Sequence, residues 1–298
     1  MLREICDLGF DSVELGYSLT RGQAEGVREW VDAGHVKVSS VHAFCPGSIN
    51  GDTGPELFRI TDKSDKEGTQ RGIKAVKETA EFAYSVGARA VVLHAGRVPI
   101  RRHVKKLEKL ADTDKLGTPK QAKVIARMMA ARDRRSKDTL DTLYESINEL
   151  LPYFEKLGIV LGLENLPTYD GIPNEPELQL LLDSFTSPSL GCWHDSGHAQ
   201  VRHNLGLTHH AGIVSRFADR IAGLHLHDVV GATSDHHMPP VEGGTVNFKI
   251  FSPLLEKGIP FVLEPTRGTD EKSIQRAVEY LTSLWGIEET TGKEDTTI

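Results

Sequence analysis

Short apolar runs alternate along the chain with segments in which apolar residues recur at helical spacing. Seven runs are rich in β-branched residues and bounded by turn residues, as buried strands are. They are residues 12–16, 37–44, 90–95, 159–165, 190–195, 221–228 and 261–264. The helical segments before the third and fourth runs end at Gly87 and Gly158, where a C-terminal cap is expected. The alternation predicts a parallel sheet covered by helices.

The strands favour an α/β fold closed into a (β/α) TIM barrel. Strands that are apolar along their whole length are buried on both faces, and a closed barrel achieves this over 298 residues. A full barrel has eight strands, whereas seven are evident here. The opening residues LREICDLGF look like the end of a first helix, so the first strand is apparently missing. We expect a single barrel domain over residues 1–287.

One long segment interrupts the repeat after the strand that ends at His94. Residues 97–137 are too many for an ordinary strand–helix loop, and residues 118–135 are rich in helix-favouring side chains. The segment carries 14 basic and 4 acidic residues, against 21 basic and 38 acidic in the remainder. We expect a basic helical insertion beside the barrel mouth whose deletion changes substrate range or assembly more than folding.

This insertion has three further interpretations. It is a solvated excursion, an arm that docks on an acidic neighbouring subunit, or a basic patch that attracts phosphates or nucleic acid. An exposed strand edge favours association, so we expect a homo-oligomer. The polar residues 288–298 predict a disordered tail.

Composition excludes a membrane protein and favours the cytoplasm. No apolar run reaches the roughly 18–20 residues that a membrane span needs. The opening residues lack the basic and apolar regions of a signal peptide. Cys6, Cys45 and Cys192 have no CxxC spacing, which fits free thiols in a reducing compartment.

Ionisable side chains stand at or near the ends of almost all the predicted strands. These side chains are His42, His94, Glu164, Asp195, His225, His227 and Glu264. The C-terminal strand ends of a barrel converge on one mouth, where active sites form. Such buried groups cost free energy unless they have partners, and a shared cation supplies one. Carboxylate and imidazole ligands suit a divalent metal such as Mn, Zn, Co, Fe or Mg.

Each group alone has a structural alternative. A single strand-end histidine is more often a hydrogen-bonded core residue, and Glu164 alone would suit a barrel-wall carboxylate paired with an arginine. His225 and His227 lie two positions apart, so they face the same side of a strand. Residues 235–237 (DHH) follow in a predicted loop, where a surface turn is the alternative. The metal-site hypothesis depends on the coincidence of all these groups at matching strand ends.

At these residues the chain resembles the xylose isomerase-like TIM barrel superfamily. This superfamily includes sugar phosphate isomerases and epimerases, and also the endonuclease IV family (AP endonuclease family 2). The segments that carry the resemblance are VVLHAG, GLENLP, CWHDSGHA, LHLHD, DHHMPPVEGGTVNF and FVLEP. The resemblance covers nearly the whole chain except the insertion and the missing first strand.

The sugar epimerase branch holds one metal with a Glu, Asp, His and Glu set. The resemblance implies that the ligands here are Glu164, Asp195, His225 and Glu264. It also implies that the two glutamates are the catalytic acid/base pair, acting through a metal-stabilised enediolate, and that His198 contacts the substrate. Further candidate substrate contacts are His42, His94 and His227.

The endonuclease IV branch uses a trinuclear zinc set with five additional ligands. The matching residues here are His42, His94, His198, Asp235 and His237. A zinc phosphodiesterase acting on abasic DNA is therefore one alternative, and a related lyase or dehydratase or a non-enzymatic barrel are others. The acidic barrel and the missing first strand argue against a nucleic-acid partner. We expect a metal-dependent isomerase or epimerase with a small carbohydrate-like substrate.

Overall fold

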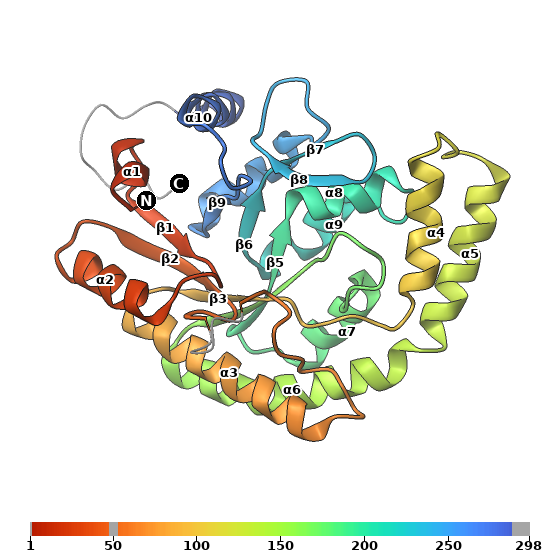
Figure 1. The fold of residues 1–298 in the computed structure, drawn as a ribbon, viewed down its shortest axis with the longest axis horizontal. Helices are drawn as coiled ribbons and strands as arrows, with labels where there is room; N and C mark the ends of the chain where they lie inside the picture. The colour runs from red at the N-terminus through yellow and green to blue at the C-terminus, as the bar shows by residue number, and fades with distance from the viewer. Residues whose placement is uncertain (1, 48–52, 288–298) are drawn as a thin grey trace.

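The main sheet of the computed structural model is parallel and contains seven strands in the order β1-β2-β3-β4-β5-β6-β9. The strands are β1 (Ser12–Leu15), β2 (Lys37–His42), β3 (Ala90–Leu93), β4 (Val160–Glu164), β5 (Leu190–Asp195), β6 (Ile221–Leu226) and β9 (Phe261–Leu263). The structure describes residues 2–47 and 53–287, without the side chains of residues 234–236, so the tail predicted at 288–298 lies outside it. All seven predicted runs form these strands. The sheet curls into a nearly closed barrel with helices around it (Figure 1), which confirms the predicted fold class.

Helices link the strands and cover the outer face of the sheet. They are α1 (Leu2–Asp7), α2 (Arg21–Asp32), α3 (Lys66–Ser85), α6 (Ser136–Leu157), α7 (Glu175–Ser184), α8 (Ser196–Asn204), α9 (His210–Phe217) and α10 (Glu271–Trp285), with 3-10 helices η1 (Ala218–Arg220) and η2 (Phe248–Lys257). Gly158 ends α6 with a φ of 69°, the left-handed conformation predicted for it. Among the described residues, no helix is long and apolar enough to cross a bilayer.

The barrel is open between β1 and β9. These two strands are the edges of the sheet and do not pair with each other in the described parts of the chain. A cavity of about 300 Å³ lies between them, lined by apolar side chains that include Ile5, Phe261 and Ile274. An eighth strand of a full barrel would lie there. The cavity also reaches Glu14 and Glu264.

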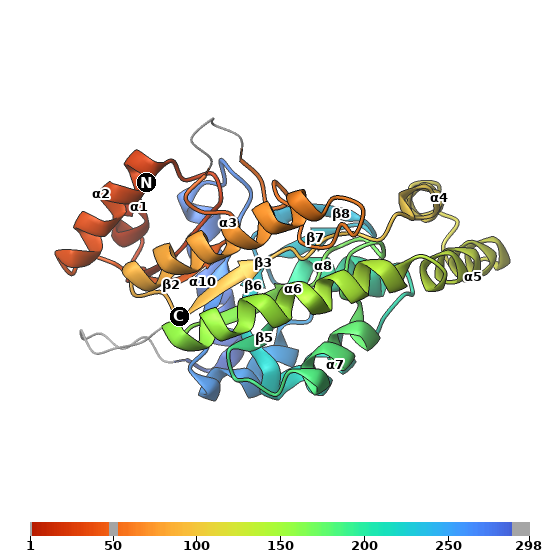
Figure 2. The ribbon, with the colours of Figure 1, turned by 90° about the horizontal axis from the view of Figure 1, so that it is seen from below.

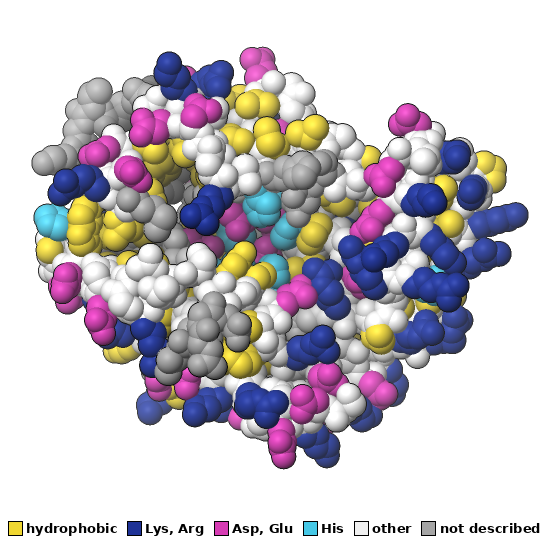
Figure 3. All heavy atoms as spheres, in the orientation of Figure 1, with side chains coloured by type: hydrophobic (Ala, Val, Ile, Leu, Met, Phe, Trp, Pro, Cys, Tyr) yellow, Lys and Arg dark blue, Asp and Glu magenta, His cyan; other side chains and the backbone are white. Residues whose placement is uncertain are grey.

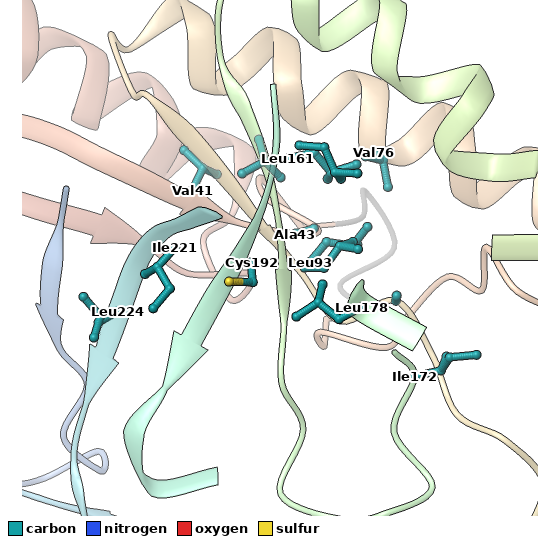
Figure 4. Close-up of a cluster of buried hydrophobic side chains, with 14 of the residues drawn as sticks. Val41, Ala43, Val76, Leu93, Leu161, Ile172, Leu178, Cys192, Ile221 and Leu224 are labelled. Carbon is teal, nitrogen blue, oxygen red and sulfur yellow. The ribbon is translucent and has the colours of Figure 1, made fainter. Parts of the chain in front are cut away.

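Successive side chains of each strand alternate between the outside and the inside of the barrel. Outward side chains from β2 to β6 meet side chains of α3 and α7 in the main core. Figure 4 shows members of this cluster, among them Val41, Val76, Leu93, Leu161, Leu178, Cys192 and Leu224. The inward positions carry the ionisable groups at the mouth end of the strands, so the same alternation that builds the core also builds the site.

Trp193 fills the interior of the barrel below the mouth. It is fully buried and packs with Ala90 and Val92. Gly223 makes room for it, because a Cβ there would lie 2.3 Å from the indole ring. Its ring lies edge-on to His225, with 5.4 Å between the centroids. Trp193 therefore forms a packed floor below the ionisable groups of the mouth.

A small hairpin follows β6. It consists of β7 (Asp228–Val230) and β8 (Ser234–Met238), which pair antiparallel. The prediction of a loop at residues 235–237 was therefore wrong. Gly231, with a φ of 68°, supports the short turn between the strands, whereas the polar composition of β8 gave no strand signal.

The basic insertion forms two helices that project from the barrel (Figures 1 and 2), as predicted. They are α4 (Arg101–Ala111) and α5 (Pro119–Asp133). Arg132, near the end of α5, is only 1% exposed. Its guanidinium donates to Glu177 at 2.5 Å and to the carbonyl oxygens of Tyr169 and Gly171. The base of the insertion is therefore part of the core, and its distal part is peripheral.

Candidate metal centre

Four predicted metal ligands meet around one ring nitrogen of His225. Its Nδ1 lies 3.4 Å from Glu164 Oε1 and 3.6 Å from Asp195 Oδ2. The same Nδ1 lies 3.2 Å from Glu264 Oε2. Glu164, Asp195 and His225 are at most 2% exposed, whereas the Glu264 side chain is 33% exposed. The potential ligand atoms of Glu164, Asp195 and His225 lie within 4.8 Å of one another, and those of Glu264, Asp195 and His227 form an adjoining group by the same measure.

Two more imidazoles reach Glu164 from the other side. His42 Nε2 lies 3.2 Å and His94 Nε2 lies 3.0 Å from Glu164 Oε2. The Nδ1 of His94 is buried and has no hydrogen-bond partner in the described portion of the chain. His42, His94 and Glu164 form a second group whose potential ligand atoms lie within 4.8 Å of one another.

A third group lies beside Asp195 and consists of His198, His227 and His237. His227 Nε2 lies 2.9 Å from Asp195 Oδ1, and its ring stacks on His237 with 4.0 Å between centroids. His237 Nδ1 lies 3.4 Å from Glu264 Oε2. The side chain of Asp235 lies outside the described part of the structure, and the structure brings all other predicted site residues to this mouth.

The DSGH segment has a local reason to place Asp195 and His198 together. Asp195 ends β5 and is the N-cap of α8, with its Oδ1 accepting from the His198 backbone N–H at 2.7 Å. The Asp195 backbone N–H donates to Asn165 Oδ1 at 2.9 Å. His198 Nδ1 lies 2.9 Å from the Asn165 carbonyl oxygen. The strand-to-helix turn therefore fixes both side chains before any ligand binds.

The carboxylates are held ionised by the imidazoles around them. Burial raises the pKa of Glu164, but the nearby His94 and His225 outweigh it and hold that pKa well below its usual value. Burial likewise raises the pKa of Asp195, and neighbouring imidazoles lower it well below its usual value. Burial lowers the pKa of His225, but Glu264, Glu14 and Glu164 raise it well above 6.5. The carboxylates therefore favour the protonated form of His225 when no metal is bound.

Two residues at the mouth are absent from the sequence predictions. Glu14, on β1, has its Oε1 2.9 Å from His225 Nε2. The strand-end criterion, applied to the first run, would have found it one position before the last strand residue. Tyr17 lies just beyond β1, with its ring 5.3 Å from that of His42. Burial raises the pKa of Tyr17, and Glu264 and Glu164 raise it further.

The mouth opens on the same face as the basic insertion. Figure 3 shows histidine and acidic side chains at the bottom of a hollow, and Lys and Arg side chains gathered over α4 and α5 beside it. The donor set fits a divalent cation, because three neighbouring carboxylates, two of them buried, repel one another unless positive charge is shared among them. Oxygen and imidazole donors of this kind hold Zn²⁺, Mn²⁺, Co²⁺ or Mg²⁺.

Comparisons with known proteins identify the family. The profile of a family described as xylose isomerase-like TIM barrel matches residues 2–284. An uncharacterized protein of Methanocaldococcus jannaschii is 28% identical over 152 residues, which are 48% of this chain and 47% of that protein. This chain thus matches about half the length of that curated relative.

Solved structures of the same fold include sugar epimerases. A D-tagatose 3-epimerase-like protein has a TM-score of 0.67 and 20% identity, with 96% of this chain and 92% of that chain covered. The IOLI protein with a bound zinc atom has a TM-score of 0.64 and 13% identity, with 96% and 92% covered. At these identities the likeness shows the fold alone.

Proposed function

Since the chain belongs to the xylose isomerase-like TIM barrel family, we propose that it is a divalent-metal-dependent isomerase or epimerase of a sugar or sugar-like substrate. The observation that carries the proposal is the convergence of three carboxylates on Nδ1 of His225. The sugar epimerases of similar fold support the substrate class. The proposed metal dependence rests on the carboxylate and imidazole groups that meet at the mouth.

Four residues would hold the cation: Glu164, Asp195, His225 and Glu264. When bound, a divalent cation supplies positive charge that polarises a carbonyl group and stabilises negative charge on oxygen. His94 Nε2 contacts Glu164 at 3.0 Å, and the buried Nδ1 of the same ring has no hydrogen-bond partner among the described residues. A hydroxyl-rich substrate would supply such an atom with a hydrogen bond.

The two glutamates are the proposed acid/base pair. Both approach His225 Nδ1 within 3.4 Å, and the lowered pKa of each carboxyl group keeps it ionised, the form in which it can act as a base. One would remove the proton from the carbon next to the substrate carbonyl. The other, after taking up a proton from a substrate hydroxyl or from water, would deliver it to the neighbouring position or the opposite face. His42, His94, His198 and His227 would orient substrate hydroxyls.

Solvent deuterium exchange tests this proposal. The protein loaded with Mn²⁺ or Co²⁺ is incubated in D₂O with D-tagatose, D-psicose or L-ribulose, and proton NMR follows the C–H bonds next to the carbonyl. We expect deuterium to enter one such position together with formation of an isomer or epimer. Absence of both across a panel of ketoses and aldoses, with metal bound, would reject the proposal.

A zinc phosphodiesterase is the second candidate, because three additional ligand groups lie beside the group of Glu164, Asp195 and His225. They are His42, His94 and Glu164; His198, His227 and His237; and Asp195, His227 and Glu264. Several cations held this closely activate water and stabilise a leaving oxygen. The basic α4 and α5 would supply phosphate contacts.

Metal stoichiometry distinguishes the two candidates. An isomerase or epimerase should bind about one ion per chain, and a multinuclear phosphodiesterase two or three, as measured by elemental analysis after purification without chelator. A double variant, His94→Ala with His237→Ala, is the matched comparison. It should still bind one ion per chain if the wild type binds one, but should bind fewer ions than the wild type if the wild type binds three. Two or more tightly bound ions, with salt-sensitive cleavage of an abasic oligonucleotide, would contradict the epimerase proposal.

A further inference from the structure

Glu14 is aimed into the barrel by an irregularity of the sheet edge. β1 pairs with β2 in the register Val13 with Val38 and then Glu14 with Ser40, so one residue of β2 is skipped. Such an irregularity re-aims the side chains next to it. It sets Glu14 beside the fully buried Ser40, whose hydroxyl donates to Glu14 Oε2 at 2.6 Å. One carboxylate oxygen of Glu14 is thereby fixed in place.

The other carboxylate oxygen holds the far side of the His225 ring. Glu14 Oε1 lies 2.9 Å from His225 Nε2, and His225 is fully buried. A carboxylate accepts hydrogen bonds, so Nε2 carries the hydrogen in this contact. The other ring nitrogen, Nδ1, is then the one that faces Glu164, Asp195 and Glu264.

Glu14 does not belong to the ligand group itself. The two nitrogens of an imidazole point in different directions, so Glu14 lies across the ring from the three carboxylates that surround Nδ1. A carboxylate in this position fixes the tautomer and orientation of a metal-bound histidine and raises its basicity. The contact at Nε2 therefore serves the metal centre through His225.

We infer that Glu14 is a positioning residue, which holds the Nε2–H of His225 so that Nδ1 is presented to the cation. This inference rests on the metal centre of the proposed function. It assigns a role to the edge strand β1, which contributes none of the four proposed ligands. Ser40 is the residue that holds Glu14.

The affinity for Zn²⁺ tests the inference. Competition with a chelating dye gives the dissociation constant for the wild type, Glu14→Ala, Glu14→Gln and Ser40→Ala. Glu14→Ala should weaken binding by about 10–100-fold, the usual effect of losing such a contact. Glu14→Gln keeps an acceptor for Nε2–H and should recover most of that loss. Glu25→Ala, on the exposed face of α2, is the control and should bind as the wild type does.

Proton NMR of protein labelled with ¹⁵N-histidine reports the contact separately from metal binding. A slowly exchanging Nε2–H of His225, distinguished from Nδ1–H by its ¹⁵N couplings to the ring protons, should be present in both metal-free and zinc-loaded wild type, weaker in Glu14→Gln and absent in Glu14→Ala. Equal zinc affinity in all variants, or an unchanged N–H signal in a folded Glu14→Ala protein, would overturn the inference. If the wild type binds no divalent metal while the N–H signal depends on Glu14, the hydrogen bond is real but the proposed function is wrong. Glu14 then has no role in metal binding.

Discussion

Glu164→Gln is expected to lower turnover by about 10²–10⁴-fold, the usual contribution of a general acid or base. Glu164 is buried and its carboxylate contacts His42, His94, His198 and His225. A glutamine keeps the shape but neither accepts a proton nor carries the charge that attracts a cation. Rates of deuterium exchange, measured with elemental analysis of the bound metal, give both effects.

Glu264→Gln should lower turnover by a similar factor with a smaller loss of metal, because the Glu264 side chain is 33% exposed and has fewer imidazole neighbours. The control is Glu145→Gln on the exposed face of α6, which should leave rate and metal content unchanged. Full activity in both site variants would end their assignment as the acid/base pair.

Arg132→Ala is expected to lower the free energy of unfolding by about 3–5 kcal/mol, the cost of leaving one partner of a buried ion pair alone. The abandoned partner is Glu177, which is 9% exposed and also caps α7 by accepting from the Asn174 backbone N–H. The carbonyl oxygens of Tyr169 and Gly171 would lose a donor as well. Urea unfolding of the metal-free protein measures the change.

The control for this prediction is Arg134→Ala, two residues further along and exposed. It should change stability by less than about 0.5 kcal/mol. Equal stability of the two variants would show that the base of the insertion is peripheral after all. The predicted loss changes the expectation for deletion of residues 97–137, because that deletion removes Arg132 and should now impair folding.

The fold was predictable because the strands bury both faces and so appear as continuous apolar runs. The hairpin was not predictable, because β8 is polar and its pairing with β7 depends on a turn at Gly231 rather than on an apolar pattern. The burial of Arg132 near the end of α5 could not be predicted either. Arg132 stands among other basic residues, and only the position of Glu177 in space distinguishes it from them.

The candidate site was predictable as far as strand ends determine position. Residues at the ends of parallel barrel strands share one mouth, so the sequence alone predicts that Glu164, Asp195 and His225 lie close together. The sequence does not reveal how these side chains are divided among separate metal sites. Glu164 and Asp195 each belong to two possible ligand groups, so the number of bound cations depends on distances and charge balance that sequence spacing does not encode. Glu14 could have been found by the same criterion, near the end of the first strand, but its contact with His225 depends on a register shift at the sheet edge that the sequence does not show.

The central claim is that side chains from separate strands hold a shared divalent cation. The most direct test is a crystal structure of the protein loaded with Zn²⁺ or Mn²⁺, with anomalous scattering recorded at the absorption edge of the metal. The account predicts an anomalous peak bonded to Glu164, Asp195, His225 Nδ1 and Glu264 at about 2.0–2.2 Å. A crystal soaked with saturating metal that shows no anomalous peak among these four side chains would contradict it.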